Sequence, residues 1–259
     1  MTIRIIVAGA SGKMGQEVVK LIEQTEHFQL VGAVSRTYAE QEVTADAKYY
    51  ATLKEAIEAT KVDVVVDFTS PEMIMKHLQI CCAYQVRPVV GTTGLTEDEL
   101  NALTAEFKQN KLGGIIAPNF AIGAILMMKF AAQAAKYLPH VEIIESHHDR
   151  KLDAPSGTAL KTAELITESR KQLKQGHPSE MEMWQGARGA EYHGFRIHSV
   201  RLPGLVAHQE VLFGGTGQLL TIRHDSLNRE SFMPGVQIAV ERVLELNELI
   251  YGLENILEV

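Results

Sequence analysis

The sequence has little cysteine, no excess of basic residues and no long apolar run. Its two cysteines, Cys81 and Cys82, are neighbours in a segment expected to be helical. A disulfide between such neighbours would be strained, so we expect two buried thiols and no disulfide scaffold. No apolar stretch reaches the roughly 20 residues of a membrane span, and the start MTIRIIVAGA lacks the features of a signal peptide. The protein is therefore expected in the cytoplasm, without a membrane partner.

The charge balance is acidic, with a formal net charge of −7. Nucleic-acid binding needs a basic surface, so no nucleic-acid partner is expected. An anionic ligand must then be held by a local cluster of basic residues. The apolar content of 46% is enough to fill the core of one large domain or of two modest ones.

The first half of the chain alternates short β-branched runs with helical stretches, which predicts a parallel sheet with crossover helices. The expected strands are Ile3–Ala8, Phe28–Val34, Val62–Phe68, Pro88–Gly91 and Gly114–Ala117. The expected helices are Gly15–Gln24, Leu53–Ala59, Pro71–Tyr84 and Thr96–Asn110. This order is typical of a Rossmann domain, which we place at residues 1–119.

The pattern changes after Pro118. A helix over Ile122–Leu138, a strand over Val141–His148 and a helix from Thr158 are expected, followed by a surface loop over Gln175–Ala190. Three β-like runs then follow, at Phe195–Leu202, His208–Gly214 and Gln218–His224. The short turns between them leave no room for crossover helices and require antiparallel or mixed pairing. We predict a C-terminal α+β domain with a mixed sheet at 120–231, and a final helix over Ser231–Ile250 in a segment, 232–259, that returns to the first domain.

A glycine-rich turn separates the first expected strand from the first expected helix. Gly9, Gly12 and Gly15 have the spacing GxxGxxG. Glycines at these positions permit a tight turn and let the backbone approach a pyrophosphate, which binds at the amino end of the helix. The position of the motif in a first βαβ unit favours dinucleotide binding over a merely structural turn.

The end of the second strand is expected to contact the adenosine ribose. Ser35 and Arg36 stand there, without a carboxylate that would repel a 2′-phosphate. Arg36 can pair with that phosphate, so NADPH is the preferred cofactor and NADH a possible one. The alternative is that Arg36 is an ordinary surface residue.

The segment EIIESHHDRKLDAPSGTAL carries the strongest chemical signal. His147, His148, Arg150 and Lys151 fall within five positions of an acidic protein, and together they can neutralise a dianion. The backbone N–H groups around 156–158 begin a helix and offer a second anion site. Two such sites suit a small dicarboxylate.

Other functions of this segment are less well supported. Adjacent strand residues point to opposite faces, so the two histidines cannot easily share a metal ion, and no metal is expected. Ser156 lacks the GxSxG context of a nucleophile. A solvated basic loop is the ordinary interpretation of a charge run, but the helix start and the upstream glycine turn argue against it.

The whole chain resembles the bacterial dihydrodipicolinate reductase (4-hydroxy-tetrahydrodipicolinate reductase) family. The resemblance rests on VAGASGKMGQE, VVDFTSPE, VVGTTGL, APNFAIG, ESHHDRKLDAPSGTA and HSVRLPGLVAHQEVLFG, in this order. It implies reduction of 4-hydroxy-tetrahydrodipicolinate to tetrahydrodipicolinate in diaminopimelate and lysine biosynthesis, by a homotetramer. Many members carry an acidic residue where this chain has Ser35, which strengthens the expectation of NADPH.

The resemblance also implies roles for particular residues. His147 and Lys151 match the catalytic acid/base candidates. The residues implied to bind the cofactor are Gly9, Gly12, Lys13, Met14, Gly15, Arg36, Phe68, Gly91, Thr93, Ala117, Asn119 and Phe120. Those implied to bind the substrate are His148, Lys151, Ser156, Gly157 and Thr158.

The sequence thus predicts hydride transfer to C4 of a cyclic unsaturated dicarboxylate, with a proton added to the neighbouring carbon. Two alternatives remain open. One is a dehydrogenase of the same two-domain plan that acts on an amino acid or a sugar. The other is a cofactor-sensing regulator without catalysis, against which the intact histidine segment argues.

Overall fold

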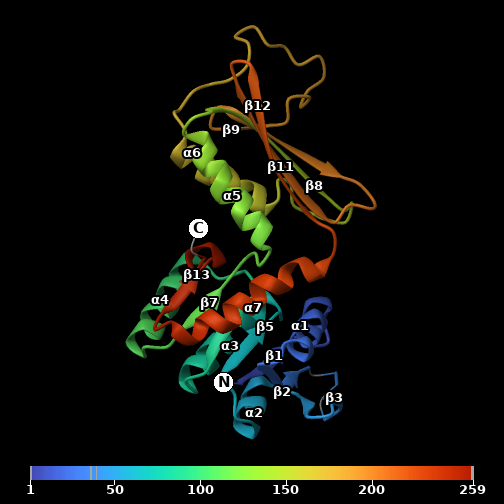
Figure 1. Ribbon diagram of the computed structural model, residues 1–259, viewed down its shortest axis with the longest axis vertical. Coiled ribbons are helices and arrows are strands. Elements are labelled where there is room, and N and C mark those ends of the chain that lie inside the picture. The colour runs from blue at the N-terminus through green and yellow to red at the C-terminus, as the bar shows by residue number, and fades with distance from the viewer. Residues whose placement is uncertain (1, 36, 39, 258–259) are drawn as a thin grey trace. The chain divides into compact units, whose positions relative to one another are not determined.

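The chain folds into two units in a computed structural model, which describes residues 2–35, 37–38 and 40–257. The first unit runs to Phe120 and resumes at Phe232, and the second spans Ala121–Ser231 (Figure 1). Each unit has its own sheet and its own buried apolar residues.

A mostly parallel sheet forms the centre of the first unit, with the strand order β13-β7-β6-β5-β1-β2-β4-β3. The strands are β1 (Ile3–Ala8), β2 (Phe28–Val34), β3 (Glu42–Thr44), β4 (Ala47–Tyr50), β5 (Val64–Asp67), β6 (Arg87–Val90), β7 (Gly114–Ile116) and β13 (Leu249–Tyr251). The central strand β1 pairs in parallel with β2 and with β5. Continuous apolar runs such as IRIIVA form these strands because a central parallel strand is covered on both faces.

Helices connect these strands. They are α1 (Lys13–Gln24), α2 (Leu53–Ala59), α3 (Pro71–Ala83), α4 (Glu97–Gln109) and α7 (Met233–Arg242), with 3₁₀ turns at η1 (Arg229–Phe232), η2 (Val243–Glu245) and η3 (Leu253–Asn255). Helix α1 packs beside α7, while α3 packs against both α2 and α4. Because parallel crossovers are right-handed, the two groups cover opposite faces of the sheet. Thr96 and Glu99 form a capping box that starts α4.

The expected strands and helices of the first unit are confirmed with small differences at their ends. The prediction of one C-terminal helix over Ser231–Ile250 is wrong, because α7 ends at Arg242 and Leu249–Tyr251 instead forms β13, paired in parallel with β7. The run LIY has the β-branched and aromatic character of a strand, and an open sheet edge is available to it. The short strands β3, β4 and β9 were also not predicted.

The second unit has a mixed sheet in the order β12-β11-β8-β10-β9. Its strands are β8 (His140–His147), β9 (Ala190–Tyr192), β10 (Phe195–Arg201), β11 (Ala207–Gly215) and β12 (Gln218–Ser226), and its helices are α5 (Ile122–Ala135) and α6 (Gly157–Ser169). Strand β8 pairs in parallel with β10 and antiparallel with β11, so the predicted mixed pairing is confirmed. The two helices lie side by side (Figure 1).

Alternation along β8 decides which of its side chains are buried. Val141, Ile143 and Glu145 are buried, whereas Glu142 and Ile144 between them are partly exposed. Gln209, the β11 partner of Glu145, donates to Thr162 on α6, so this buried face is the one that the helices cover. The Glu145 carboxylate therefore lies on the buried face of the sheet, next to Ile143 and Gln209.

The two cysteines lie in α3 as free, buried thiols, as predicted. Burial raises the pKa of Cys82 to about 11, and it raises the pKa of Cys81 still further. Within the described residues, no helix is both long and apolar enough to cross a membrane.

Candidate active site

The glycine-rich turn after β1 can exist only with glycine at two of its positions. Gly9 has a φ of +81°, and a Cβ built on it would lie 2.6 Å from the backbone oxygen of Phe68. A Cβ on Gly15 would lie 2.1 Å from the oxygen of Gly9. Gly12 is the N-cap of α1, and no described side chain caps this helix. Its first N–H groups therefore suit an anion such as a pyrophosphate.

A cavity of about 760 Å³ adjoins this turn. Its polar wall carries the hydroxyl side chains of Ser11, Ser35, Thr37, Thr52, Thr69 and Ser70 and the basic side chains of Lys54, Lys76 and His77. No carboxylate is found among the described residues that line it. The Ser11 and Ser35 hydroxyls are hydrogen-bonded at 3.2 Å. Arg36, which was predicted to contact the adenosine ribose, lies outside the described residues.

A buried carboxylate holds the turn after β5. Asp67 is 1% exposed, and its Oδ1 accepts hydrogen bonds from the backbone N (2.8 Å) and Oγ1 (2.6 Å) of Thr69. Its Oδ2 lies 2.6 Å from Nδ1 of the buried His77 on α3. This pair fixes the edge of the cavity and was not predicted from the sequence.

The residues implied to bind the nicotinamide end lie after the carboxyl ends of three neighbouring strands. Phe68 follows β5, Gly91 and Thr93 follow β6, and Ala117, Asn119 and Phe120 follow β7. A Cβ on Gly91 would lie 2.0 Å from Cε1 of Phe68, and the Phe68 and Phe120 rings are 5.7 Å apart between centroids. The fold thus brings together residues that are far apart in the sequence at the edge where open α/β sheets bind ligands.

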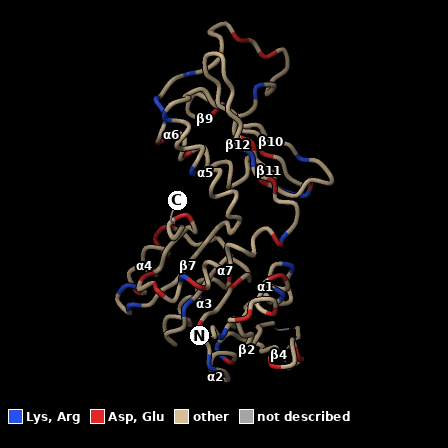
Figure 2. The backbone as a smooth tube through the Cα atoms, in the orientation of Figure 1, with Lys and Arg blue, Asp and Glu red and all other residues tan. Residues whose placement is uncertain are grey.

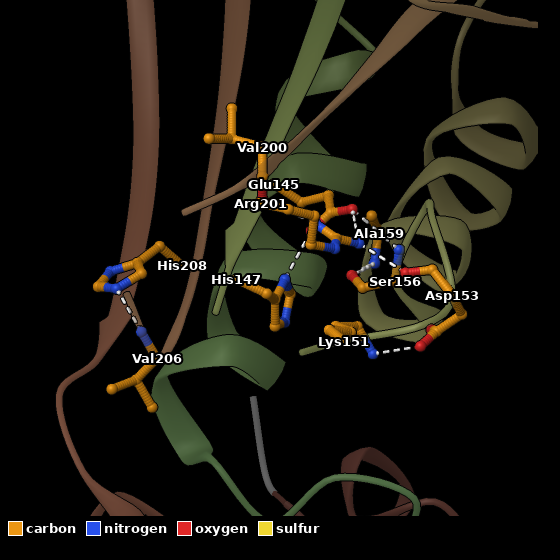
Figure 3. A network of polar contacts seen from close by, with 10 residues as sticks. All are labelled: Glu145, His147, Lys151, Asp153, Ser156, Ala159, Val200, Arg201, Val206 and His208. Atoms are coloured by element: carbon orange, nitrogen blue, oxygen red, sulfur yellow. Dashed lines mark hydrogen bonds and ion pairs between the residues drawn. The ribbon is translucent and has the colours of Figure 1, made fainter. Parts of the chain in front are cut away.

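In the second unit, a polar network surrounds the end of β8 (Figure 3). Glu145 is fully buried. Its Oε2 lies 2.6 Å from Nδ1 of His147 and accepts from Nη1 of Arg201 at 2.9 Å. Its Oε1 accepts from Nη2 of Arg201 at 2.8 Å and from the backbone N of Ser156 at 3.2 Å. Arg201 also donates to the backbone oxygen of Asp153 at 2.6 Å.

These contacts decide the charge of Glu145. Burial alone would raise the pKa of this carboxyl, but hydrogen bonds from His147 and Arg201 outweigh burial and lower the pKa to about 2. The carboxylate is therefore ionised at neutral pH. Because the pKa of Glu145 is lower in the folded protein than in the unfolded chain, its ionised form stabilises the fold at any pH above about 4.5, the unfolded value. This stabilisation is lost as the pH falls from about 4.5 toward 2.

Glu145→Gln is accordingly expected to lower the free energy of unfolding by up to about 3 kcal/mol at neutral pH. The difference from the unchanged protein should shrink as the pH falls below about 4.5. Urea unfolding followed by circular dichroism between pH 7 and pH 3 measures it. Glu168→Gln, at an exposed position of α6, is the control and should differ little at any pH. A difference that stays constant with pH would contradict the charge assignment.

The predicted substrate residues gather around this network. Lys151 Nζ lies 2.8 Å from Oδ1 of the exposed Asp153. Nδ1 of His148 is buried without a hydrogen-bond partner among the described residues. A Cβ on Gly157, the first residue of α6, would meet no atom within 4 Å, so there is space for a ligand at this helix start.

The contacts of Ser156 bear on the predicted anion site, in which its role stays a prediction. The N–H of Ser156 donates to Glu145, and its Oγ accepts from the backbone N of Ala159 as the N-cap of α6. The side chain of Ser156 is also almost fully buried. An anion at this helix start would therefore meet Gly157 and Thr158 before it meets Ser156. The same capping role argues against Ser156 as a nucleophile.

Several residues at these sites were not assigned a role from the sequence. Glu145 stands two positions before His147, and strand alternation alone places the two on one face. Arg201, by contrast, is 56 residues from Glu145 and gives no sequence signal of its own. Lys54 and Lys76 likewise reach the cavity from two separate helices. No group of three His, Cys, Asp or Glu in the described chain is placed to hold a metal ion.

A Rossmann unit with a glycine cradle, combined in one chain with a unit that carries a basic strand end, defines a two-domain nicotinamide-dependent oxidoreductase. The family model "Dihydrodipicolinate reductase, N-terminus" matches residues 3–120, and "Dihydrodipicolinate reductase, C-terminus" matches residues 123–257. The chain belongs to the dihydrodipicolinate reductase family.

Similar proteins extend over the whole chain. It is 56% identical over 263 residues to the 4-hydroxy-tetrahydrodipicolinate reductase of Bacillus subtilis, with 99% of this chain and 98% of the relative covered. It is also 56% identical over 265 residues to that of Geobacillus thermodenitrificans, with both chains fully covered. The dipicolinate-bound dihydrodipicolinate reductase from Paenisporosarcina sp. TG-14 superposes with a TM-score of 0.93 at 52% identity, covering 99% of this chain and 100% of that one. A probable dehydrogenase from Thermotoga maritima, at 12% identity and a TM-score of 0.67 over 98% of this chain and 92% of that one, shares the fold alone.

Proposed function

We propose that this chain uses NADPH to reduce 4-hydroxy-tetrahydrodipicolinate to tetrahydrodipicolinate, with the residues of the two units in the roles given below. The chain is an oxidoreductase of diaminopimelate and lysine biosynthesis, as its named relatives are. One observation carries the assignment of roles. The basic residues at and after the end of β8 lie near the start of α6, where Gly157 leaves space for a ligand, and the same chain has a glycine-rich turn that suits a dinucleotide. A dipicolinate-bound relative supports a dicarboxylate as the ligand of this chain.

The first unit fits a nicotinamide dinucleotide. The absence of a Cβ at Gly9 and Gly15 lets the turn close, and the Gly12 N–H then donates to the backbone oxygen of Gly9 at 2.9 Å. The N–H groups of Lys13 and Met14, which follow Gly12 at the start of α1, form the pyrophosphate site. Phe68 supplies apolar ring surface for the nicotinamide end and packs against the buried Phe120, beside Gly91, Thr93, Ala117 and Asn119. When bound, the cofactor supplies a hydride to the substrate.

The charge of the cavity favours NADPH over NADH. A ribose that carries a 2′-phosphate requires positive charge and no nearby carboxylate. Lys54 and Lys76 line the cavity, Ser35 replaces the acidic residue that favours NAD, and Arg36 follows Ser35 in the sequence. Basic groups and hydroxyls donate hydrogen bonds to phosphate oxygens. NADH would use the same cavity without these contacts.

Arg36→Asp tests this preference. Since a charge-assisted contact contributes about 1.5–3 kcal/mol, we expect NADPH affinity to fall by about 10- to 100-fold while NADH affinity changes little. Titration calorimetry with both cofactors measures the two constants. Lys61→Asp is the control. It makes the same reversal of charge just before β5, at the amino ends of the parallel strands, and should leave the affinities for NADPH and NADH unchanged. Equal losses for NADPH and NADH in Arg36→Asp would show that Arg36 does not contact the 2′-phosphate.

In the second unit, charge and position assign the substrate roles. His148 and Lys151 bind one carboxylate of the dianion, and the start of α6 at Gly157 and Thr158, capped by Ser156, binds the other. Lys151 and His147 are the candidates that donate the proton, because both are titratable and lie at the end of β8 or in the loop after it. Lys151 is the first candidate, since its flexible chain can leave the exposed Asp153.

We also propose a cytoplasmic homotetramer that assembles through the sheet of the second unit. The face of this sheet opposite α5 and α6 carries Ile144, Val200, Leu212 and Leu219 by strand alternation. Val200 is 40% exposed and Leu219 69%. The same face also carries Glu142, Glu210 and Arg223. Figure 2 shows acidic and basic residues along β10, β11 and β12. Exposed apolar side chains with charged neighbours are typical of a protein interface. Sedimentation velocity measures the assembly directly.

An absorbance assay tests the activity. NADPH and substrate synthesised in a coupled reaction are mixed with the protein, and the NADPH band is followed, with NADH in a parallel assay. Faster loss of the band with NADPH than with NADH is expected. No oxidation of either cofactor would contradict the proposed reaction, and equal rates at low cofactor concentration would contradict the preference.

A further inference from the structure

Glu145 is surrounded by hydrogen-bond donors from three separate segments of the second unit. His147 lies on the same strand, Arg201 on the neighbouring strand β10, and the Ser156 N–H at the start of α6 (Figure 3). Both carboxylate oxygens accept two of these contacts each. Because a buried carboxylate without partners would be costly, this set of donors explains how Glu145 is kept ionised on the buried face of the sheet.

An ionised carboxylate can only accept hydrogen bonds. Nδ1 of His147, at 2.6 Å from Oε2, must therefore carry a proton. In neutral histidine only one ring nitrogen is protonated, so the remaining nitrogen, Nε2, is left bare. Nε2 is then the only atom of His147 that can gain or lose a proton during turnover.

Arg201 links this histidine to the lysine loop, the segment between β8 and α6 that carries Lys151 and Asp153. Its guanidinium binds both oxygens of Glu145 and also donates to the backbone oxygen of Asp153, whose side chain holds Lys151. The bidentate ion pair offsets the negative charge of Glu145, so the carboxylate does not weaken the attraction for a substrate dianion. One ion pair thus supports the histidine, the lysine loop and the helix start.

We propose that Glu145, held by Arg201, is a positioning residue for the reduction: it fixes His147 as the Nδ1–H form and so makes Nε2 the nitrogen that exchanges a proton with the substrate site. This inference rests on the proposed function of His147. It also assigns to Glu145 the alignment of the α6 start through the N–H of Ser156.

Nitrogen NMR of the protein labelled with ¹⁵N-histidine tests the tautomer without any activity measurement. The signals of His147 are identified as those that His147→Gln removes from among the 10 histidines. At a pH where His147 is neutral, we expect a protonated Nδ1 and a bare Nε2. In Glu145→Gln, where the side-chain amide can also donate, we expect a mixture of tautomers or the reverse form. A protonated Nε2 and bare Nδ1 in the unchanged protein would overturn the proposal.

Kinetics test the consequence for turnover. Loss of a residue that orients a functional histidine typically costs about 10- to 100-fold, so kcat of Glu145→Gln should fall by this factor while the NADPH dissociation constant is retained. Glu142→Gln is a matched control, because Glu142 on the same strand also contacts a histidine, His198 (2.5 Å), and an arginine, Arg188 (2.7 Å), on the opposite face. Its kcat should be nearly unchanged.

Two results separate failure of this inference from failure of the proposed function. If His147→Gln lowers kcat and Glu145→Gln, folded by circular dichroism, does not, the positioning role is wrong and the role of His147 stands. If His147→Gln itself leaves kcat unchanged, the proposed role of His147 is wrong and Glu145 has no proton donor to position. Partial recovery of kcat in Glu145→Asp, relative to Glu145→Gln, would support the need for a carboxylate.

Discussion

Replacement of Lys151 by alanine is expected to lower kcat by about 10²- to 10⁴-fold, the usual span for the loss of a general acid, while NADPH affinity stays nearly normal. Reduction of the ring leaves electron density on a carbon that must gain a proton, and a donor works only within hydrogen-bond reach. Lys151 is held 2.8 Å from Asp153, which is exposed, so its ammonium group can leave that carboxylate for a bound dianion.

Steady-state kinetics with each substrate varied separate the roles of the basic residues. His147→Ala should also lower kcat, whereas His148→Ala should act mainly through KM for the dicarboxylate. Asp153→Asn is the matched control for the lysine loop, because it removes the carboxylate that pairs with Lys151 and keeps the lysine. If Lys151→Ala raised KM alone, Lys151 would be a binding residue and the donor would be His147 or water.

Replacement of Gly15 by alanine is expected to weaken NADPH binding by about 100-fold or more and to destabilise the first unit. The new Cβ would lie 2.1 Å from the oxygen of Gly9 and 2.6 Å from Cα of Ala10. These are backbone atoms of the turn itself, so relief requires the turn to move away from α1. Overpacking of this kind costs about 1–3 kcal/mol or more, and the displaced turn loses charge-assisted contacts to the pyrophosphate, each contributing about 1.5–3 kcal/mol.

Gly113→Ala separates the two effects. Its Cβ would lie 2.5 Å from the backbone oxygens of Val243 and Leu246, a comparable clash in the same unit but just before β7, at the amino edge of the sheet. Thermal unfolding should show both variants destabilised, and fluorescence titration should show NADPH affinity lost only in Gly15→Ala. Equal affinity losses in the two variants would mean that general destabilisation, and not the turn, explains the effect.

The sequence by itself determined the architecture of the first unit. Its β-branched runs and helical stretches alternate in a period that only a parallel sheet with crossovers satisfies, and the spacing of Gly9, Gly12 and Gly15 marks a turn at which the backbone comes close to itself. The mixed pairing of the second unit also followed from the sequence, because turns of a few residues cannot hold a crossover helix. These features are local, so a single segment carries all the information for each.

Tertiary structure alone decided the features that join distant segments. Leu249–Tyr251 became a strand because β7 offered it an edge, whereas its own sequence extended an apparent helix. The sequence placed Glu145 near His147, but the parallel pairing of β10 with β8 brought Arg201 to it across 56 residues, and the return of the chain at α6 added the Ser156 N–H. A buried carboxylate is tolerated only where several donors converge on it, and that convergence depends on strand register and helix placement, which no single segment of the sequence specifies.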